Sequence, residues 1–383
     1  TLVAGARRTQ TRPQQQQRAL RVASSFFRRA GSCGSVGASA AAAAASGGRL
    51  RGRRPASRVA MAKGSKKEFP EGAFFKYEDG GAPLPCVDIG ANLVDEAFAG
   101  DVAAVLARAG AAGVRAVVVT GTSVEGSRRA LKFVDEWHAG EEQKDAGVAL
   151  FATVGVHPHD AKSCVVNHNS SGGTGDGETS EDTPEIQLLD SFLPTLRELA
   201  AHPRCVAIGE CGLDFDRNFS PPDVQRRVFE CQVALAKELG KPLFMHCREA
   251  TADLASILER QQPLGVDGVV HCFTGTRKEA ETFLGMGLHI GVTGWICDDR
   301  EGRSAQVSEA VAVVPAGKLM VETDAPYLTP RTIRPNRVRP WRNEPCLLPH
   351  VMSKVAQARD QPMEDLATEA LATTQEFFNI ELT

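Results

Sequence analysis

The ten residues Val206-Ala207-Ile208-Gly209-Glu210-Cys211-Gly212-Leu213-Asp214-Phe215 join a short apolar run to a carboxylate flanked by glycines. An apolar run of this length is typical of a strand that is buried on both faces of a parallel sheet. Glu210 then stands where the strand ends and a loop begins, which is where α/β enzymes place their catalytic groups. An ion pair with a nearby Lys or Arg would explain a single glutamate equally well, so the interpretation depends on the other strand ends.

Apolar strands alternate with amphipathic stretches of helix length from about Pro85 onward, which is the pattern of consecutive βα units. Eight strands are predicted, over Cys86–Ile89, Val114–Thr120, Val148–Val156, Cys205–Glu210, Pro242–His246, Gly268–His271, Leu288–Thr293 and Lys318–Glu322. Eight such units predict an α/β protein with a (β/α)8 TIM barrel over residues 85–382. The alternative is an open doubly wound sheet. Such a sheet usually carries a Gly-x-Gly-x-x-Gly loop after its first strand, and this chain has no such motif.

The charge is distributed unevenly along the chain. Residues 1–67 contain 12 Arg and 3 Lys but no Asp or Glu, so this segment carries +15 and the rest carries −18, given a net charge of −3. Acid-free segments rich in Arg, Ala and Ser are typical of transit peptides, which predicts a disordered extension directing the protein to a plastid or mitochondrion. Two other interpretations stay open. Met61 could be the true start of a cytoplasmic protein, or the segment could be a basic arm that binds nucleic acid.

The remaining composition fits a globular core. Hydrophobic residues make up 42% of the chain, and no apolar run approaches the roughly 18 residues that span a bilayer, so no membrane contact is expected. Ten cysteines are scattered without Cys-x-x-Cys or zinc-finger spacing, which is typical of small core residues in a reducing compartment. Residues 163–185 are rich in Ser, Gly and acidic residues and are predicted to be a disordered surface insertion.

Four strand ends carry side chains that can bind a cation. Glu210, His246, His271 and Asp324 each follow a different strand, and in a barrel the carboxyl ends of all strands meet at one rim. One histidine after an apolar strand is more often a core or capping residue, but four such residues at four strand ends are hard to explain in this way. Two imidazoles and two carboxylates therefore predict a site for a divalent cation.

Longer motifs surround these four residues. They are Asp88-Ile89-Gly90-Ala91-Asn92-Leu93, Gly155-Val156-His157-Pro158-His159-Asp160, Ile208 to Phe215, Met245-His246-Cys247-Arg248, His271-Cys272-Phe273-Thr274-Gly275, Glu322-Thr323-Asp324-Ala325-Pro326-Tyr327-Leu328 and Arg342-Asn343-Glu344-Pro345. From Cys86 to about Ile380 the chain resembles the TatD family of metal-dependent deoxyribonucleases, within the amidohydrolase-like hydrolases and closest to the TatD-proper branch. The resemblance implies a TIM barrel, a divalent metal, and 3′→5′ exonuclease or endonuclease activity on DNA.

The resemblance also implies roles for individual residues. Glu210, His246 and His271 match metal ligands, and Asp324 matches an aspartate that binds metal or accepts the proton of the attacking water. His159 matches a histidine expected near the substrate phosphate, and we take Asp324, Glu210 and His159 as the catalytic candidates.

The number of metal ions is left open by the end of the first strand. Many relatives carry His-x-His there and bind a second metal, whereas this chain has Gly90 and Asn92. The amide oxygen of Asn92 suits Mg²⁺ or Mn²⁺ better than Zn²⁺, so Mg²⁺ is the expected metal, with one or two ions bound.

Metal-assisted hydrolysis of a phosphodiester is the resulting hypothesis, with Arg248, Arg217, Arg342 and Asn92 as candidate substrate contacts. Trp295 and Tyr327 could stack a base at a strand end or simply pack the barrel mouth. A body charge of −18 does not attract DNA over its whole surface, so binding to single strands or strand ends through a local basic patch is expected.

Other functions remain compatible with the sequence. A hydrolase of the same fold could act on a small amide, an ester or a D-aminoacyl-tRNA, and a non-catalytic binding protein would need neither metal nor Glu210. Oligomeric state and the preference for DNA or RNA are not predicted.

Overall fold

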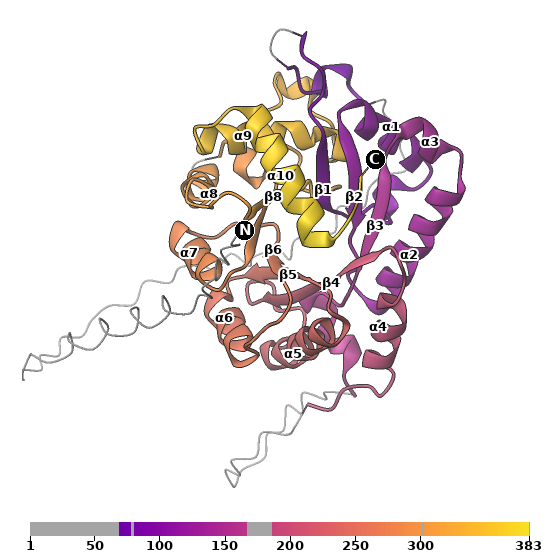
Figure 1. Ribbon diagram of the computed structural model, residues 1–383, viewed down its shortest axis with the longest axis vertical. Helices are drawn as coiled ribbons and strands as arrows, with labels where there is room; N and C mark the ends of the chain where they lie inside the picture. Colours follow the sequence, from indigo (N-terminus) through magenta and orange to yellow (C-terminus); the bar gives the residue numbers. More distant parts are fainter. Residues whose placement is uncertain (1–68, 78–79, 167–185, 301, 383) are drawn as a thin grey trace, which may run out of the picture. The chain divides into compact units, whose positions relative to one another are not determined.

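Eight parallel strands form one sheet in the order β1 to β8 (Figure 1). The computed structural model describes residues 69–77, 80–166, 186–300 and 302–382. The strands are β1 (Cys86–Ala91), β2 (Val114–Val119), β3 (Ala149–Val154), β4 (Cys205–Asp214), β5 (Leu243–Arg248), β6 (Gly268–Val270), β7 (His289–Val292) and β8 (Leu319–Val321). A bridge between Ala91 and Ala325 joins β1 to the residues after β8, so the sheet closes on itself. The predicted (β/α)8 barrel is confirmed.

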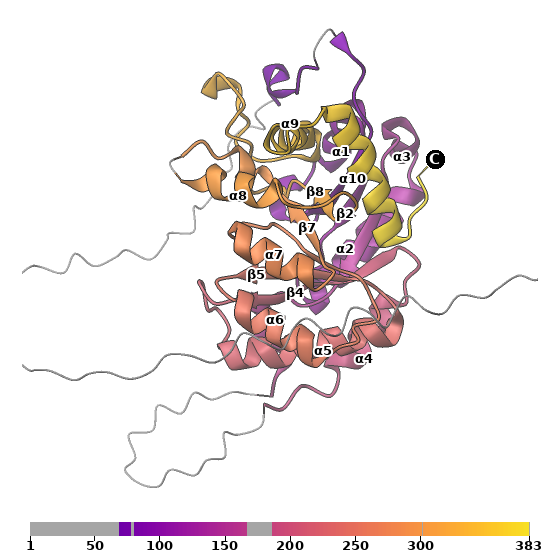
Figure 2. The ribbon, with the colours of Figure 1, turned by 60° about the vertical axis from the view of Figure 1, so that its left-hand side comes forward.

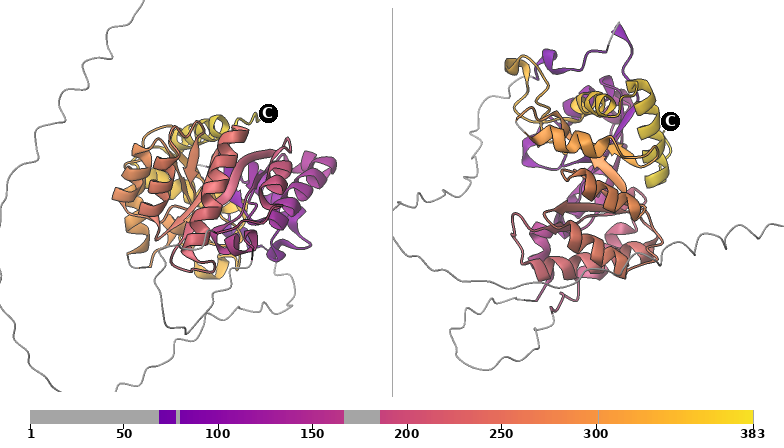
Figure 3. Two further views of the ribbon diagram at one scale, coloured as in Figure 1. Left: turned by 90° about the horizontal axis from the view of Figure 1, so that it is seen from below. Right: turned by 90° about the vertical axis from the view of Figure 1, so that its left-hand side faces the viewer.

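Helices surround the barrel in the views of Figures 1 to 3. They are α1 (Val102–Ala111), α2 (Val124–Ala139), α3 (Glu142–Ala146), α4 (Phe192–Ala200), α5 (Pro222–Leu239), α6 (Thr251–Arg260), α7 (Arg277–Gly285), α8 (Arg303–Val311), α9 (Leu348–Ala358) and α10 (Met363–Phe378). Short 3-10 helices are η1 (Glu71–Ala73), η3 (Glu96–Phe98), η4 (Pro158–Cys164), η5 (Gly294–Cys297), η6 (Asn336–Val338) and η7 (Pro345–Leu347). In the described part of the chain, no helix combines the length and the apolar character needed to cross a bilayer.

The strand period divides the buried residues into two layers. In β2, Ala116 and Val118 belong to a cluster inside the barrel, whereas Val117 and Val119 belong to the cluster that packs against the helices. Phe377 from the end of α10 joins the inner cluster. Side chains therefore fill the barrel interior, and the carboxyl ends of the strands are left to build a site.

Several predicted boundaries are corrected. Strand β4 continues four residues beyond Glu210 to Asp214, whereas β6 and β8 end before His271 and Glu322. The insertion begins later than residue 163, because Ser163 belongs to η4 and Val165 forms an antiparallel bridge with Leu188.

Two predicted segments cannot be compared with the structure. The predicted extension, residues 1–67, and most of the predicted insertion, residues 167–185, lie outside the described residues.

Candidate active site

Glu210 is the centre of a buried polar cluster at the carboxyl ends of the strands. Its Oε1 atom lies 2.8 Å from His271 Nε2, 3.1 Å from His246 Nδ1 and 3.2 Å from His157 Nε2. Its backbone N–H donates to Gly121 O at 2.7 Å, which ties β4 to the loop after β2. Only 6% of Glu210 is exposed, so three imidazoles from three different elements share one carboxylate oxygen away from bulk water.

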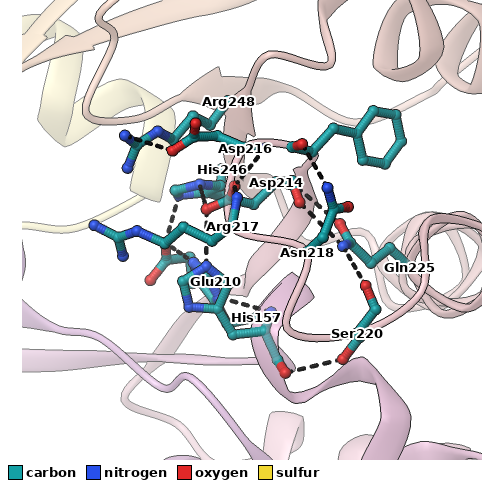
Figure 4. Close-up of polar contacts among 12 residues, drawn as sticks. His157, Glu210, Asp214, Asp216, Arg217, Asn218, Ser220, Gln225, His246 and Arg248 are labelled. Carbon is teal, nitrogen blue, oxygen red and sulfur yellow. Dashed lines mark hydrogen bonds and ion pairs between the residues drawn. The ribbon is translucent and has the colours of Figure 1, made fainter. Parts of the chain in front are cut away.

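Each histidine is positioned by local structure. His246 lies within β5, and His271 directly follows β6. His157 is the N-cap of η4, where its Nδ1 accepts the backbone N–H of His159 at 3.0 Å. Because Nδ1 accepts that bond, Nε2 is the atom that His157 directs at Glu210, as a donor in the neutral ring or as a ligand atom. Figure 4 shows His157 and His246 directed toward Glu210.

Asp214 contacts the imidazoles of His159 and His246 on the side away from Glu210. Its Oδ2 lies 2.8 Å from His159 Nε2 and 3.4 Å from His246 Nε2, and the residue has no exposed surface. Its Oδ1 accepts the backbone N–H of Arg217 at 2.9 Å. Burial alone would raise the pKa of Asp214, but the hydrogen bond from His159 and the nearby imidazole of His246 outweigh it and hold that pKa well below its usual range.

A second group of carboxylates lies on the other side of His271. Glu322 is fully buried, accepts the backbone N–H of Cys272 at 2.5 Å, and places Oε2 3.3 Å from His271 Nδ1. Asp324 Oδ1 accepts the side-chain N–H of Asn92 at 3.1 Å. His271 is thus held between Glu210 and Glu322, a carboxylate on each ring nitrogen.

Burial and charge oppose each other in this cluster. Burial would raise the pKa of Glu210, but the imidazoles of His157 and His271 hold it well below its usual range. Burial would lower the pKa of His271, but Glu210 and Glu322 raise it well above the ordinary value. Burial, reinforced by Glu210 and Glu322 and opposed by His271, raises the pKa of Asp324 to about 8. Glu210, Glu322 and Asp324 lie so close together that a bound proton or cation between them is favoured.

The donor set fits a divalent cation. Ligand atoms of His157, Glu210 and His246 all lie within 4.8 Å of one another. His246 Nε2 is buried and has no hydrogen-bond partner among the described residues, although Asp214 is 3.4 Å away. A buried ring nitrogen without a hydrogen bond is costly unless a cation or a proton engages it. Mixed imidazole and carboxylate ligands are those that divalent metals take in proteins.

Most of the predicted site residues are brought together. Glu210, His246 and His271 are in direct contact, and Asp324 lies near enough for their charges to act on it. Asn92 is bonded to Asp324 through its amide nitrogen.

Glu322 also accounts for Gly90. A Cβ atom at position 90 would lie 2.5 Å from Glu322 Oε2, so this carboxylate fills the space that a side chain on that residue would need.

His159 and the predicted arginines of the rim lie around this cluster. The His159 ring is 4.2 Å from that of His157, centroid to centroid, and is bonded to Asp214. Arg248 ends β5 and pairs with Asp216 at 2.8 Å with 38% of its side chain exposed, and Figure 4 shows the two directed toward each other. Arg217 is exposed on the loop after β4.

Arg342 requires a correction. Its guanidinium bonds Asp101 at 2.6 Å and Glu344 at 2.9 Å, lies over the ring of Phe98, and is buried, with only 6% of the residue exposed. Arg342 therefore joins the segment before η7 to the start of α1, and its side chain is not presented to a substrate.

The sequence prediction missed three residues of the cluster, His157, Asp214 and Glu322. Each lies at or just after the carboxyl end of a strand, as the predicted residues do. His157 follows β3 and caps η4, two residues before His159. Asp214 lies four residues after Glu210 on the same strand, and both carboxylates contact the imidazole of His246. Glu322 directly follows β8, two residues before Asp324.

Comparisons with known proteins agree with one another. A family model described as TatD related DNase matches residues 87–379. The 3′-5′ ssDNA/RNA exonuclease TatD of Pantoea vagans is 43% identical over 281 residues, which cover 73% of this chain and 94% of that protein. A protein of the same name from Edwardsiella piscicida is 42% identical over 275 residues, covering 72% and 92%.

Solved structures give the same fold. The crystal structure of a TatD homologue from Escherichia coli K12 has a TM-score of 0.62 at 26% identity, covering 77% of this chain and 98% of that one. A TatD family hydrolase from Entamoeba histolytica, 23% identical, has the same TM-score of 0.62 and covers 78% of this chain and 99% of its own.

Proposed function

Because the chain belongs to the family of TatD related DNases, we propose that it removes nucleotides from the 3′ end of single-stranded DNA in a reaction that needs a divalent metal. The chain is a hydrolytic deoxyribonuclease of this family. The observation that carries the proposal is the convergence of His157, His246 and His271 on one oxygen of Glu210 at the barrel rim. Polarity and preference for single strands are supported by the names of relatives that this chain covers almost completely.

His157, Glu210, His246 and His271 would hold the metal, with Asp324 beside them. When bound, a divalent cation polarises a phosphate oxygen and lowers the pKa of a water molecule. We propose Mg²⁺ or Mn²⁺ as the working metal, because the carboxylates and the Asn92 amide offer oxygen ligands. The imidazoles would also bind Zn²⁺, so activity and affinity have to be measured separately for each metal.

The surrounding side chains have distinct tasks. Asn92 donates to Asp324 Oδ1, which leaves Oδ2 to accept the proton of the attacking water. Asp214 fixes the ring of His159, which then stands at the edge of the cluster beside His157 and can contact a phosphate oxygen. Arg248, half-exposed at the end of β5, can hold a second phosphate oxygen with its planar guanidinium.

The test uses the purified chain and single-stranded DNA labelled at its 5′ end, with Mg²⁺, Mn²⁺ or Zn²⁺ added after chelation. Shortening of the labelled strand one nucleotide at a time is expected, with no cleavage in chelator and none when the 3′ end is blocked. Hydrolysis of simple carboxylic esters or D-aminoacyl-tRNA without DNA cleavage would overturn the proposal in favour of another hydrolase of this fold.

We further propose that residues 1–67 direct the protein to a plastid or mitochondrion. The support is the absence of Asp and Glu from a segment with 12 Arg and 3 Lys. A fluorescent protein fused to this segment should enter an organelle, and a cytosolic signal would contradict the proposal.

A further inference from the structure

A strongly basic loop starts and ends beside the active site. We call residues 327–342 the arginine loop. Its last twelve residues contain Arg331, Arg334, Arg337, Arg339 and Arg342 and no acidic residue. At one end the backbone N–H of Tyr327 donates to Asp324 O at 3.0 Å, and at the other the N–H of Asn343 donates to Pro326 O at 3.0 Å. Both ends are therefore fixed to the segment that carries Asp324.

Among the described residues around this loop, positive charge exceeds negative charge. Five arginines lie about two aspartates, Asp298 and Asp299; they are Arg300, Arg303, Arg331, Arg334 and Arg339. Asp298 alone is contacted by three of them. Figure 2 shows the loop, in gold, projecting beside α8, whose first turn supplies Arg303.

Arg339 is held in this cluster without a partner for one of its nitrogens. Its Nη1 is buried and forms no hydrogen bond within the described residues. Burial, followed by the charges of Arg331 and Arg334, lowers the pKa of Arg339. An arginine that served only the fold would be expected to pair with a carboxylate, as Arg342 does. A buried N–H group without a partner, close to Arg331 and Arg334, fits an anionic ligand.

Exposed aromatic rings lie at both ends of the loop. Tyr327 is 55% exposed and Trp341 is 52% exposed, and both are large apolar side chains that folding usually covers. Aromatic rings next to arginines are the components of surfaces that bind single-stranded nucleic acid, because bases stack on the rings and phosphates bind the guanidinium groups.

We propose that the arginine loop binds the part of a single-stranded nucleic acid that extends beyond the reacting end, with Arg337 and Arg339 on phosphates and Trp341 under a base. This inference rests on the proposed nuclease function and adds a second contact surface to it. Arg337 lies six positions before Asn343, whose N–H is bonded to Pro326 O, so the chain between them reaches at most about 21 Å. At about 3.4 Å per nucleotide, a strand would meet the loop within roughly seven nucleotides of the reacting phosphate.

The overall charge makes such a surface necessary. Residues 68–383 carry −18, which repels a polyanion from most of the body. A local excess of arginine next to the site overcomes that repulsion where the strand must enter.

The experiment measures strand affinity in the presence of chelator, so that no cleavage occurs. Single-stranded DNA of about 20 nucleotides, long enough to reach the loop, is titrated by fluorescence anisotropy at several salt concentrations. The double variant Arg337→Gln and Arg339→Gln should bind about tenfold more weakly. The slope of log K against log salt should fall in magnitude by about 1.4, or 0.7 for each phosphate contact. Trp341→Ala should weaken binding by a similar factor, and Arg339→Lys, which keeps the charge, should retain most of the affinity.

Controls separate this effect from folding and from the active site. Arg129→Gln removes an exposed arginine of α2, and should leave the affinity unchanged. Thermal melts of the double variant should match the parent, because Arg337 is exposed and Arg339 is repelled by its neighbours. Cleavage of a dinucleotide, too short to reach the loop, should also be unchanged.

Two results would tell the two proposals apart. If the double variant binds long DNA with the parent's affinity and salt slope, the arginine loop has no role, even if DNA is cleaved. If the chain cleaves no DNA but binding still depends on the loop, the proposed function fails and the binding surface stands.

Discussion

The substitution Asp214→Asn tests how much the carboxylate that contacts His159 and His246 contributes to the site, because it leaves Glu210 and the three histidines around it unchanged. Asp214 Oδ2 faces His159 and His246, while Oδ1 accepts the backbone N–H groups of Asp216 and Arg217 at 3.1 and 2.9 Å. Asparagine has nearly the same shape, but only one of its terminal atoms accepts hydrogen bonds. With that oxygen on the backbone, the NH₂ group faces both imidazoles and the negative charge beside them is lost.

The expected loss follows from the contacts. Asp214 is completely buried, so water does not replace the hydrogen bond to His159, and a bond to a charged group contributes about 1.5–3 kcal/mol. The free energy of unfolding should fall by about that amount. Metal affinity and activity should fall about 10- to 100-fold, as is typical when a group that orients a ligating histidine is removed.

The assay compares urea unfolding, metal titration and single-stranded DNA cleavage for Asp214→Asn with the same measurements for Asp135→Asn. Asp135 also pairs with an imidazole, that of His202 at 3.0 Å, but its side chain is 58% exposed and lies on α2. An exposed pair contributes less than about 1 kcal/mol, so this control should change little in any measurement. Wild-type metal affinity and cleavage in Asp214→Asn would refute the assigned role, and so would an equal loss in the control.

Three further predictions concern residues around the site. Arg342→Met removes the bonds of the buried guanidinium to Glu344 and Asp101 but leaves Glu344 its ion pair with Arg108, so it should cost about 1.5–3 kcal/mol of unfolding free energy in urea, with cleavage by the folded fraction unchanged; lost DNA affinity at unchanged stability would restore Arg342 as a substrate contact. Gly90→Ala should displace Glu322 and lower the unfolding free energy by about 1–3 kcal/mol, and a variant as stable as the parent would show that this space is not filled. Replacing residues 167–185 by a short turn should leave the melting temperature unchanged, because Val166 N donates to Gln187 O at 2.9 Å and already brings the two ends together; failure to fold would contradict this.

The sequence predicted the barrel and the centre of its site for a simple geometric reason. Parallel strands in a closed sheet bring their carboxyl ends to one rim, so Glu210, His246 and His271 could be placed together from strand ends alone. Contacts made by side chains that do not lie at strand ends could not be predicted in this way. Arg342 pairs with Asp101, 241 residues away in the chain, and no local sequence pattern predicts that partner.

Other errors came from where an element was expected to end. Ending the fourth strand at Glu210 left Asp214 outside the predicted strand, and with it the group that holds His159.

The most direct test of the metal site is Glu210→Gln, with bound metal, thermal melt and single-stranded DNA cleavage measured on the same preparation. Glutamine keeps the shape of Glu210 but not the negative charge on which three imidazoles converge. The variant should stay folded, lose its metal and cleave DNA more than about 100-fold more slowly, since it changes a ligand and not only a supporting group. Near-normal cleavage by a folded variant that has lost its metal would contradict the account.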